Sequence, residues 1–206
     1  MLERLGTKFV GGTFEDLSVD KGNQEAFDRA LKIADGDKRG LVLLGKIGRG
    51  KTALLAALAN AFDRAEEGSF EERDGRDVWV CRAKRRQAEV WSILDLVAAL
   101  RDQARSERTK NTVCESCMYA DLLLIDDLGA ERSTDFVLEE LQRIFDYRYR
   151  HELPIVITSN LTLDEIGSKY GARPISRWVE SCAIIRMKGP DRRLKEGKGR
   201  NQNGAE

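Results

Sequence analysis

A glycine-rich stretch that ends in a lysine and a threonine carries the clearest chemical signal in this 206-residue chain. Residues 45–52 read Gly-Lys-Ile-Gly-Arg-Gly-Lys-Thr, which fits the pattern G-x-x-x-x-G-K-[ST]. In this pattern backbone N–H groups surround the phosphates of a nucleotide, the lysine reaches the β- and γ-phosphates, and the hydroxyl binds Mg²⁺. The sequence therefore predicts ATP and Mg²⁺ as cofactors, bound by Gly45, Lys46, Ile47, Gly48, Arg49, Gly50, Lys51 and Thr52.

A pair of carboxylates supplies the second half of a magnesium–nucleotide site. Asp126 and Asp127 follow the aliphatic run 122–125, which is typical of a strand buried on both faces. We expect Asp126 to hold the magnesium ion through water, and Asp127 to orient or deprotonate the attacking water. Alone, these residues could equally form an acidic turn after a strand. Beside a phosphate-binding loop the catalytic interpretation is favoured.

Three further polar residues are candidates for the reaction. The amide of Asn160 can donate and accept hydrogen bonds, which suits holding a water against the γ-phosphate. An asparagine in a turn after a strand is the common alternative. Arg177 and Arg193 could neutralise charge on the transferring phosphoryl group, although isolated arginines are usually just solvated.

Strands that alternate with helices must position these residues. Apolar runs predict five strands, at 41–44, 78–81, 122–125, 155–158 and 183–185. The charged segment 66–77 is interpreted as a loop and 90–100 as a helix. The expected fold is an α/β P-loop NTPase with a parallel five-stranded sheet and helices on both faces. At the shared carboxyl edge of such a sheet, the glycine loop, the two aspartates and the segment 158–160 should meet.

Composition limits the class of protein. The 35 basic and 35 acidic residues cancel, so a nucleic-acid surface must be a local patch. Candidate patches are the tail, Lys84-Arg85-Arg86, and Arg101, Arg105, Arg108 and Lys110. No apolar run is long enough for a membrane span and no signal peptide opens the chain, so we expect a cytoplasmic protein with no membrane partner. Cys114 and Cys117 lack the two further ligands of a zinc site.

The order of these motifs resembles that of the DnaC/DnaI helicase loaders, a family of AAA+ ATPases that also includes the IstB-like transposition ATPases. The likeness covers about residues 10–193, and its specific part is the run Ile-Asp-Asp-Leu-Gly-Ala-Glu at 125–131. The resemblance implies that Asn160 is sensor 1, that Arg177 is an arginine finger acting on a neighbouring subunit, and that Arg193 is sensor 2.

The family also implies partners and an oligomer. Expected partners are single-stranded DNA, a replicative hexameric helicase, or for the IstB-like alternative a transposase. The ATP sites are expected to be shared between subunits of a self-oligomer. Family members usually carry an additional N-terminal domain, and most AAA+ proteins have a helical lid. This chain begins almost at the ATPase core and is expected to lack a separate lid domain.

Domain organisation and two other function classes complete the expectations. We expect a flexible arm at 1–12, the ATP-binding domain at 13–193 and a disordered basic tail at 194–206. A P-loop small-molecule kinase is one alternative, and stimulation of ATP turnover by DNA would argue against it. A nucleotide-gated adaptor without hydrolysis is another. The intact set of Lys51, Thr52, Asp126 and Asp127 argues against that adaptor.

Overall fold

The computed structural model describes residues 2–64, 68–73, 76–81, 86–105, 113–132 and 134–191. The strands of its main sheet are β1 (Gly40–Leu44), β4 (Ala88–Ser92), β5 (Leu122–Asp126), β6 (Ile155–Ser159) and β7 (Cys182–Arg186). The helices are α1 (Gln24–Ala34), α2 (Lys51–Arg64), α3 (Ile93–Ala104), α4 (Val113–Tyr119), α5 (Asp135–Arg150), α6 (Leu163–Tyr170) and α7 (Ala172–Ser181).

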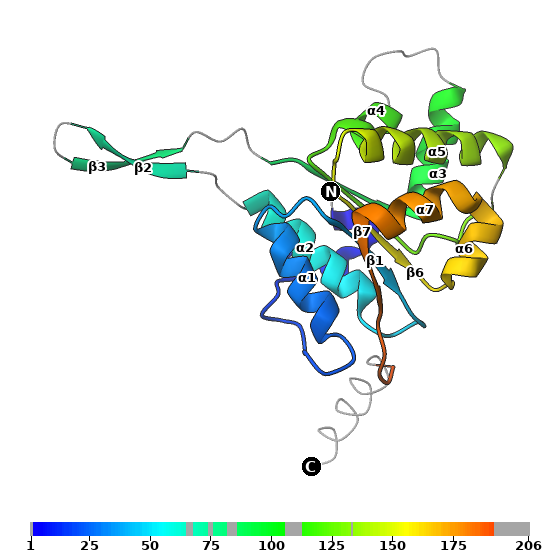
Figure 1. Ribbon diagram of the computed structural model, residues 1–206, viewed down its shortest axis with the longest axis horizontal. Helices are drawn as coiled ribbons and strands as arrows, with labels where there is room; N and C mark the ends of the chain where they lie inside the picture. The colour runs from blue at the N-terminus through cyan, green and yellow to red at the C-terminus, as the bar shows by residue number, and fades with distance from the viewer. Residues whose placement is uncertain are drawn as a thin grey trace.

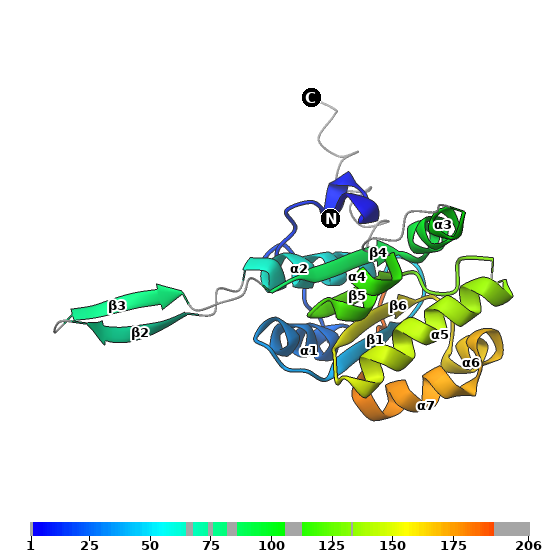
Figure 2. The ribbon, with the colours of Figure 1, turned by 90° about the horizontal axis from the view of Figure 1, so that it is seen from above.

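The main sheet has five strands in the order β4-β5-β6-β1-β7, and every neighbouring pair is parallel. Figure 1 labels β1, β6 and β7, and Figure 2 labels β4 and β5. Helices cover both of its faces: Figure 2 shows α1 and α2 on one side and α5 and α7 on the other. This arrangement confirms the predicted α/β fold class. No helix in the part of the chain that the structure describes is long and apolar enough to cross a membrane.

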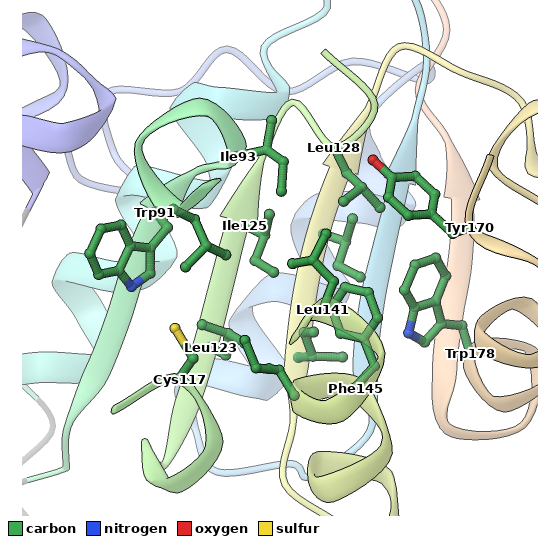
Figure 3. Packing of buried hydrophobic residues seen from close by; sticks show 14 of the residues in the cluster. Trp91, Ile93, Cys117, Leu123, Ile125, Leu128, Leu141, Phe145, Tyr170 and Trp178 are labelled. Carbon is green, nitrogen blue, oxygen red and sulfur yellow. The ribbon is translucent and has the colours of Figure 1, made fainter. Parts of the chain in front are cut away.

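Alternation along the central strands produces two hydrophobic cores, one on each face of the sheet. Leu41 and Leu43 of β1 join the core under α1 and α2, whereas Val42 and Leu44 join the core under α3, α5 and α7. In the second core, Phe145 and Trp178 pack edge to face with ring centroids 5.2 Å apart (Figure 3). Because β1, β5 and β6 are buried at every position, each appears in the sequence as an unbroken apolar run.

The second strand of the sheet is not the predicted one. The apolar run 78–81 belongs to β3 (Arg76–Cys81), which pairs antiparallel with β2 (Gly68–Arg73) in a separate hairpin (Figure 1). In the main sheet the strand that precedes β5 in the sequence is instead β4, whose residues overlap the start of the predicted helix 90–100. The hydroxyl of Ser92 accepts a hydrogen bond from the N–H of Asp95 at 3.1 Å. This cap makes α3 begin only after Ser92, so that the preceding residues remain extended.

The segment that we expected to be a flexible arm packs against the sheet domain along residues 2–9. It forms two 3-10 turns, η1 (Leu2–Leu5) and η2 (Thr7–Phe9), and Leu2 is buried in the core beside α2. The guanidinium of Arg4 lies 3.5 Å from the ring centroid of Trp91 and pairs with Glu89 at 3.4 Å. These contacts attach the segment to β4. The predicted tail, 194–206, lies outside the described residues.

A buried arginine joins the ends of three elements near the amino edge of the sheet. The side chain of Arg148 is 1% exposed and donates from Nη1 to the carbonyls of Cys117, Ala120 and Met118 at 2.8, 2.9 and 3.3 Å. Its Nη2 donates to the carbonyl of Pro154 at 2.6 Å, just before β6. Burial lowers the pKa of Arg148 to about 10, so the side chain remains charged at neutral pH. It thereby satisfies carbonyls at the end of α4 and at the starts of β5 and β6.

We expect the substitution Arg148→Met to lower the free energy of unfolding by roughly 2–4 kcal/mol, because buried carbonyls without a donor each cost about 1–3 kcal/mol. Urea unfolding followed by circular dichroism would measure the change. Arg150→Met is the matched control, since Arg150 lies on the same helix but is exposed. Equal midpoints for the two variants would contradict this role of Arg148.

Candidate active site

The predicted phosphate-binding loop connects β1 to α2, and the helix begins at Lys51. Gly48 and Gly50 have φ angles of 78° and 89°, in the left-handed region that favours glycine. A Cβ atom at Gly48 would also overlap the carboxylate of Asp191. Left-handed residues in such a loop turn successive N–H groups to one side, and α2 adds the partial positive charge of its N-terminus. The loop therefore has the geometry of a phosphate-binding site.

Lys51 points along this loop rather than into solvent. Its side chain is buried, and Nζ donates hydrogen bonds to the carbonyls of Gly45 at 2.6 Å and Lys46 at 3.2 Å. It also donates to Oδ1 of Asn160 at 2.8 Å. These contacts hold the end of the side chain inside the loop, where a lysine ammonium group can reach phosphate oxygens. This geometry fits an ATP phosphate chain lying in the loop.

A carboxylate and two hydroxyls meet beside the loop. The hydroxyl of Thr52 lies 3.0 and 3.1 Å from the carboxylate oxygens of Asp126, and the hydroxyl of Thr158 donates to Asp126 at 2.6 Å. Burial raises the pKa of Asp126 above its ordinary value, against the opposing effect of these hydrogen bonds. A divalent cation here would stabilise the ionised carboxylate. Because Mg²⁺ prefers oxygen ligands, Thr52 and Asp126 fit the predicted magnesium site.

Asp127 and Asn160 also come together, although they follow different strands. Asn160 donates from Nδ2 to Oδ1 of Asp127 at 3.0 Å. The sheet order places β6 between β1 and β5, so the residue after β6 lies between the other two motifs. Asn160 consequently contacts both Lys51 and Asp127. This is the position from which a carboxylate and an amide can orient a water molecule against a γ-phosphate.

Thr158 is a site residue to which the sequence analysis gave no role of its own. It is fully buried in β6, where its hydroxyl donates to Asp126 and accepts a hydrogen bond from the N–H of Asp127 at 2.9 Å. It thus orients both members of the acidic pair. The available signal was a hydroxyl residue at the end of an otherwise aliphatic buried strand, since such a group needs a hydrogen-bond partner.

Arg177 lies away from these residues in the same chain. It lines a cleft of about 500 Å³ together with Gly40, Ile155 and Cys182, which begin β1, β6 and β7. The phosphate-binding loop follows the opposite end of the five-residue β1, roughly 15 Å away at about 3.3 Å per residue. Arg177 therefore lies outside the ATP site of its own subunit. Arg193 lies outside the described residues.

Within its own chain, Arg177 forms an ion pair with Asp146 of α5. Its guanidinium also lies 5.0 Å from the ring centroid of Tyr149. Arg173, one turn earlier on α7, pairs with the same carboxylate at 2.9 Å. The intrasubunit contact is a competing explanation for Arg177, and its role as an arginine finger remains a prediction.

The two nearby cysteines lie in the core rather than at this site. Cys114 and Cys117 are buried on α4, and burial raises their pKa values to about 11 and about 12. Arg143 donates to the sulfur of Cys114 at 3.3 Å. Across the described ranges, no group of three or more His, Cys, Asp and Glu side chains is arranged to hold a metal ion. These thiols pack against β5 and α5.

The fold and the site together define the chain as a P-loop ATPase of the AAA+ class. Among solved structures, the DnaC helicase loader matches with a TM-score of 0.70 and 19% identity, covering 89% of this chain and 100% of that one. Replication initiator DnaA bound to AMPPCP and single-stranded DNA also matches with a TM-score of 0.70, at 21% identity, covering 96% and 56%.

The sequence model of the bacterial DnaA ATPase domain matches residues 8–178, and the chain belongs to this family. The replicative helicase loader DnaI of Bacillus subtilis (strain 168) is 30% identical, covering 89% of this chain and 59% of DnaI. The phage-like element PBSX protein XkdC of the same strain is 33% identical, covering 88% of this chain and 69% of XkdC. The chain thus spans a little over half of the length of DnaI.

Proposed function

We propose that this chain is an ATP-hydrolysing AAA+ protein that uses its ATP cycle to control the assembly of a replicative helicase on single-stranded DNA. The observation that carries the proposal is the hydrogen-bonded chain from Lys51 through Asn160 to Asp127, beside the contact of Thr52 with Asp126. The helicase assignment is supported by DnaI, whose name is replicative helicase loader. Support for the DNA partner comes from the related DnaA structure, which is bound to single-stranded DNA.

In the proposed reaction each group has one task. The N–H groups of the loop and Lys51 hold the β- and γ-phosphates, while Thr52 and Asp126 hold Mg²⁺. When bound, this ion neutralises negative charge on the phosphate oxygens. Asp127 accepts a proton from the attacking water, and Asn160 keeps that water in line with the γ-phosphate. Arg177 of a neighbouring subunit supplies positive charge to the transferring group.

The described part of the proposed DNA surface consists of the carboxyl end of α3 and Arg86, whose guanidinium donates to the carbonyl of Ala34 at 3.0 Å. Arg101 donates to the carbonyl of Arg132 at 3.2 Å, in the loop between β5 and α5. The side chain of Arg105 is 81% exposed and lies 4.0 Å from a carboxylate oxygen of Asp102. Lys84, Arg85, Arg108 and Lys110 lie outside the described residues. Arginines of this kind suit binding to the phosphate backbone without base readout.

The DNA proposal predicts salt-sensitive, sequence-tolerant binding of single-stranded DNA that is tighter with ATP. Each phosphate contact should contribute about −0.7 to the slope of log K against log salt. The double variant Arg101→Gln/Arg105→Gln should therefore reduce the steepness of that slope by about 1.4. Fluorescence anisotropy with oligonucleotides would measure it, and Arg150→Gln, on exposed α5 surface, is the control.

Assays of hydrolysis, DNA binding and co-migration on the same protein preparation distinguish the proposed function from its alternatives. Hydrolysis of ATP to ADP and phosphate, stimulated by single-stranded DNA and needing no other acceptor than water, would contradict a small-molecule kinase. DNA binding that is flat from low to physiological salt would contradict the nucleic-acid part of the proposal. ATP-dependent co-migration with a hexameric helicase supports loading, whereas co-migration with a transposase instead would support the IstB-like role.

A further inference from the structure

A buried ionic cluster lies next to the acidic pair, and the proposed reaction does not use it. The side chain of Glu131 is 1% exposed, and its Oε1 lies 3.0 Å from Nζ of Lys169. The hydroxyl of Tyr170 donates a hydrogen bond to the same carboxylate. Lys169 and Tyr170 are the last two residues of α6. The cluster therefore joins the end of a helix to the loop that follows β5.

This cluster binds the loop through its backbone as well as through Glu131. Oε2 of Glu131 accepts a hydrogen bond from the N–H of Gly129 at 3.1 Å. Lys169 donates to the carbonyls of Gly129 and Glu131 at 2.7 and 2.6 Å. In the core view, Tyr170 lies beside Leu128 with its hydroxyl oxygen directed toward that residue (Figure 3). The loop 127–131 is thus held along most of its length by residues of α6.

The loop begins at a backbone conformation that needs such support. Asp127 has a φ angle of 56°, in the left-handed region, although it is not glycine. Conformations of this kind cost of order 1–3 kcal/mol and persist only where surrounding contacts enforce them. The N–H groups of Asp127 and Leu128 are held by Thr158, at 2.9 and 2.8 Å. The contacts of Glu131 hold the other end of the same turn.

Stability alone is a weak reason for a buried ion pair. Burial by itself raises the pKa of Glu131, but hydrogen bonds from Tyr170 and Lys169 outweigh it, and the pKa lies below its usual range. The carboxylate is therefore ionised at neutral pH and paired. Taking two such charges out of water offsets most of their attraction, so an apolar pair of similar size would stabilise the fold about as well. The ion pair and the four hydrogen bonds around it instead restrict the loop to a single geometry.

We propose that Glu131 is a positioning residue for ATP hydrolysis: with Lys169 and Tyr170 it holds the turn 127–131 so that the carboxylate of Asp127 keeps its orientation toward the attacking water. This role rests on the proposed ATPase activity. It predicts an effect on the chemical step rather than on nucleotide binding, because Lys51 and Thr52 belong to the start of α2, whereas the contacts of Glu131, Lys169 and Tyr170 described above hold the loop after β5.

The test compares the turnover number with ATP affinity in three variants. Glu131→Gln should lower kcat by roughly 10–100-fold, the scale expected for misplacement of a reacting group by about 1 Å, while the Kd for ATP stays within about two-fold. Tyr170→Phe removes one hydrogen bond to Glu131 and should lower kcat by less, whereas Lys169→Met removes the three contacts of its ammonium group and should lower kcat by a similar factor. The milder variant Tyr170→Phe keeps the test informative if Glu131→Gln folds poorly.

Glu165→Ala is the control. Glu165 belongs to the same helix and accepts a hydrogen bond from the N–H of Thr162 at 2.7 Å in its capping box, but it is exposed. Loss of this hydrogen bond should lower stability by about 1 kcal/mol without changing kcat. If Glu165→Ala lowers kcat as much as Glu131→Gln does, general destabilisation of α6 explains the effect and the positioning role is wrong.

A double-variant experiment asks whether Glu131 acts through Asp127. In the Asp127→Asn background, Glu131→Gln should lower the residual single-turnover rate by less than about two-fold, since the group to be positioned is gone. A full additional 10–100-fold loss would overturn the proposal. A parent protein that hydrolyses no ATP would contradict the proposed function and this role with it. An active parent whose Glu131→Gln variant keeps its kcat contradicts only the positioning role.

Discussion

Replacing Lys51 with alanine should weaken ATP binding by roughly 100-fold, because hydrogen bonds to charged groups contribute about 1.5–3 kcal/mol each. The side chain of Lys51 lies along the phosphate-binding loop, and its Nζ lies 2.6 Å from the carbonyl oxygen of Gly45. Titration of a fluorescent ATP analogue in the presence of Mg²⁺ would measure the change in Kd. Lys46→Ala is the matched control, since Lys46 belongs to the same loop but has an exposed side chain.

Asp127→Asn should behave in the opposite way, with binding retained and turnover lost. The amide keeps the size of the side chain and can still bond to Asn160, but it cannot accept a proton from water. The pair of variants therefore separates binding from chemistry. If Lys51→Ala binds ATP as tightly as the parent does, the site is wrongly assigned, whatever happens to turnover.

Arg177→Ala should nearly abolish ATP hydrolysis while ATP binding survives. An arginine supplied to a neighbouring site can contribute on the order of 10³–10⁵ in rate. The position of Arg177 at the edge of the sheet opposite the phosphate-binding loop requires that any such site belongs to another subunit. Steady-state hydrolysis at protein concentrations that favour the oligomer would measure the loss. Arg173→Ala is the control, because Arg173 pairs with the same Asp146 and is 69% exposed.

Mixing two inactive variants distinguishes a role of Arg177 in a shared ATP site from a role only in the ion pair with Asp146. Arg177→Ala and Lys51→Ala should each be inactive alone and regain part of the activity together, since a Lys51→Ala subunit can lend its Arg177 to an intact site. Asp146→Asn tests the competing explanation directly. Under the finger role this variant should keep its hydrolysis, because Asp146 contacts Arg177 within its own subunit and takes no part in the reaction. No recovery in a preparation shown to exchange subunits, or an inactive Asp146→Asn variant, would count against the shared site.

The local motifs of the site follow from the sequence because each is a short-range pattern. The loop 45–52, the acidic pair Asp126–Asp127 and the turn at Asn160 each follow a strand whose apolar run is unbroken. Parallel strands share a carboxyl edge, so the meeting of these motifs could be predicted without coordinates. The contact of Thr52 with Asp126 and that of Asn160 with Asp127 agree with this expectation.

These local sequence patterns could not predict which strands pair with each other. The run 78–81 and the residues of β4 have similar apolar character, yet β4 pairs with β5 and the run pairs with its own neighbour in a hairpin. A propensity for extended structure does not determine the strand with which a segment pairs, because pairing depends on residues far away in the chain. Ser92 caps the helix that follows it, and only the pairing with β5 showed that an extended strand precedes this cap.

The partners of several charged side chains were likewise determined only by the tertiary structure. Glu131, Arg148 and Arg177 look like ordinary solvated residues in the sequence, since charged side chains are usually exposed. The fold gives them partners from elements about 25–40 positions away in the chain: Tyr170 for Glu131, the carbonyl of Ala120 for Arg148, and Asp146 for Arg177. Motif chemistry is encoded locally, whereas the groups that orient it acquire their roles only when distant segments pack together and exclude water.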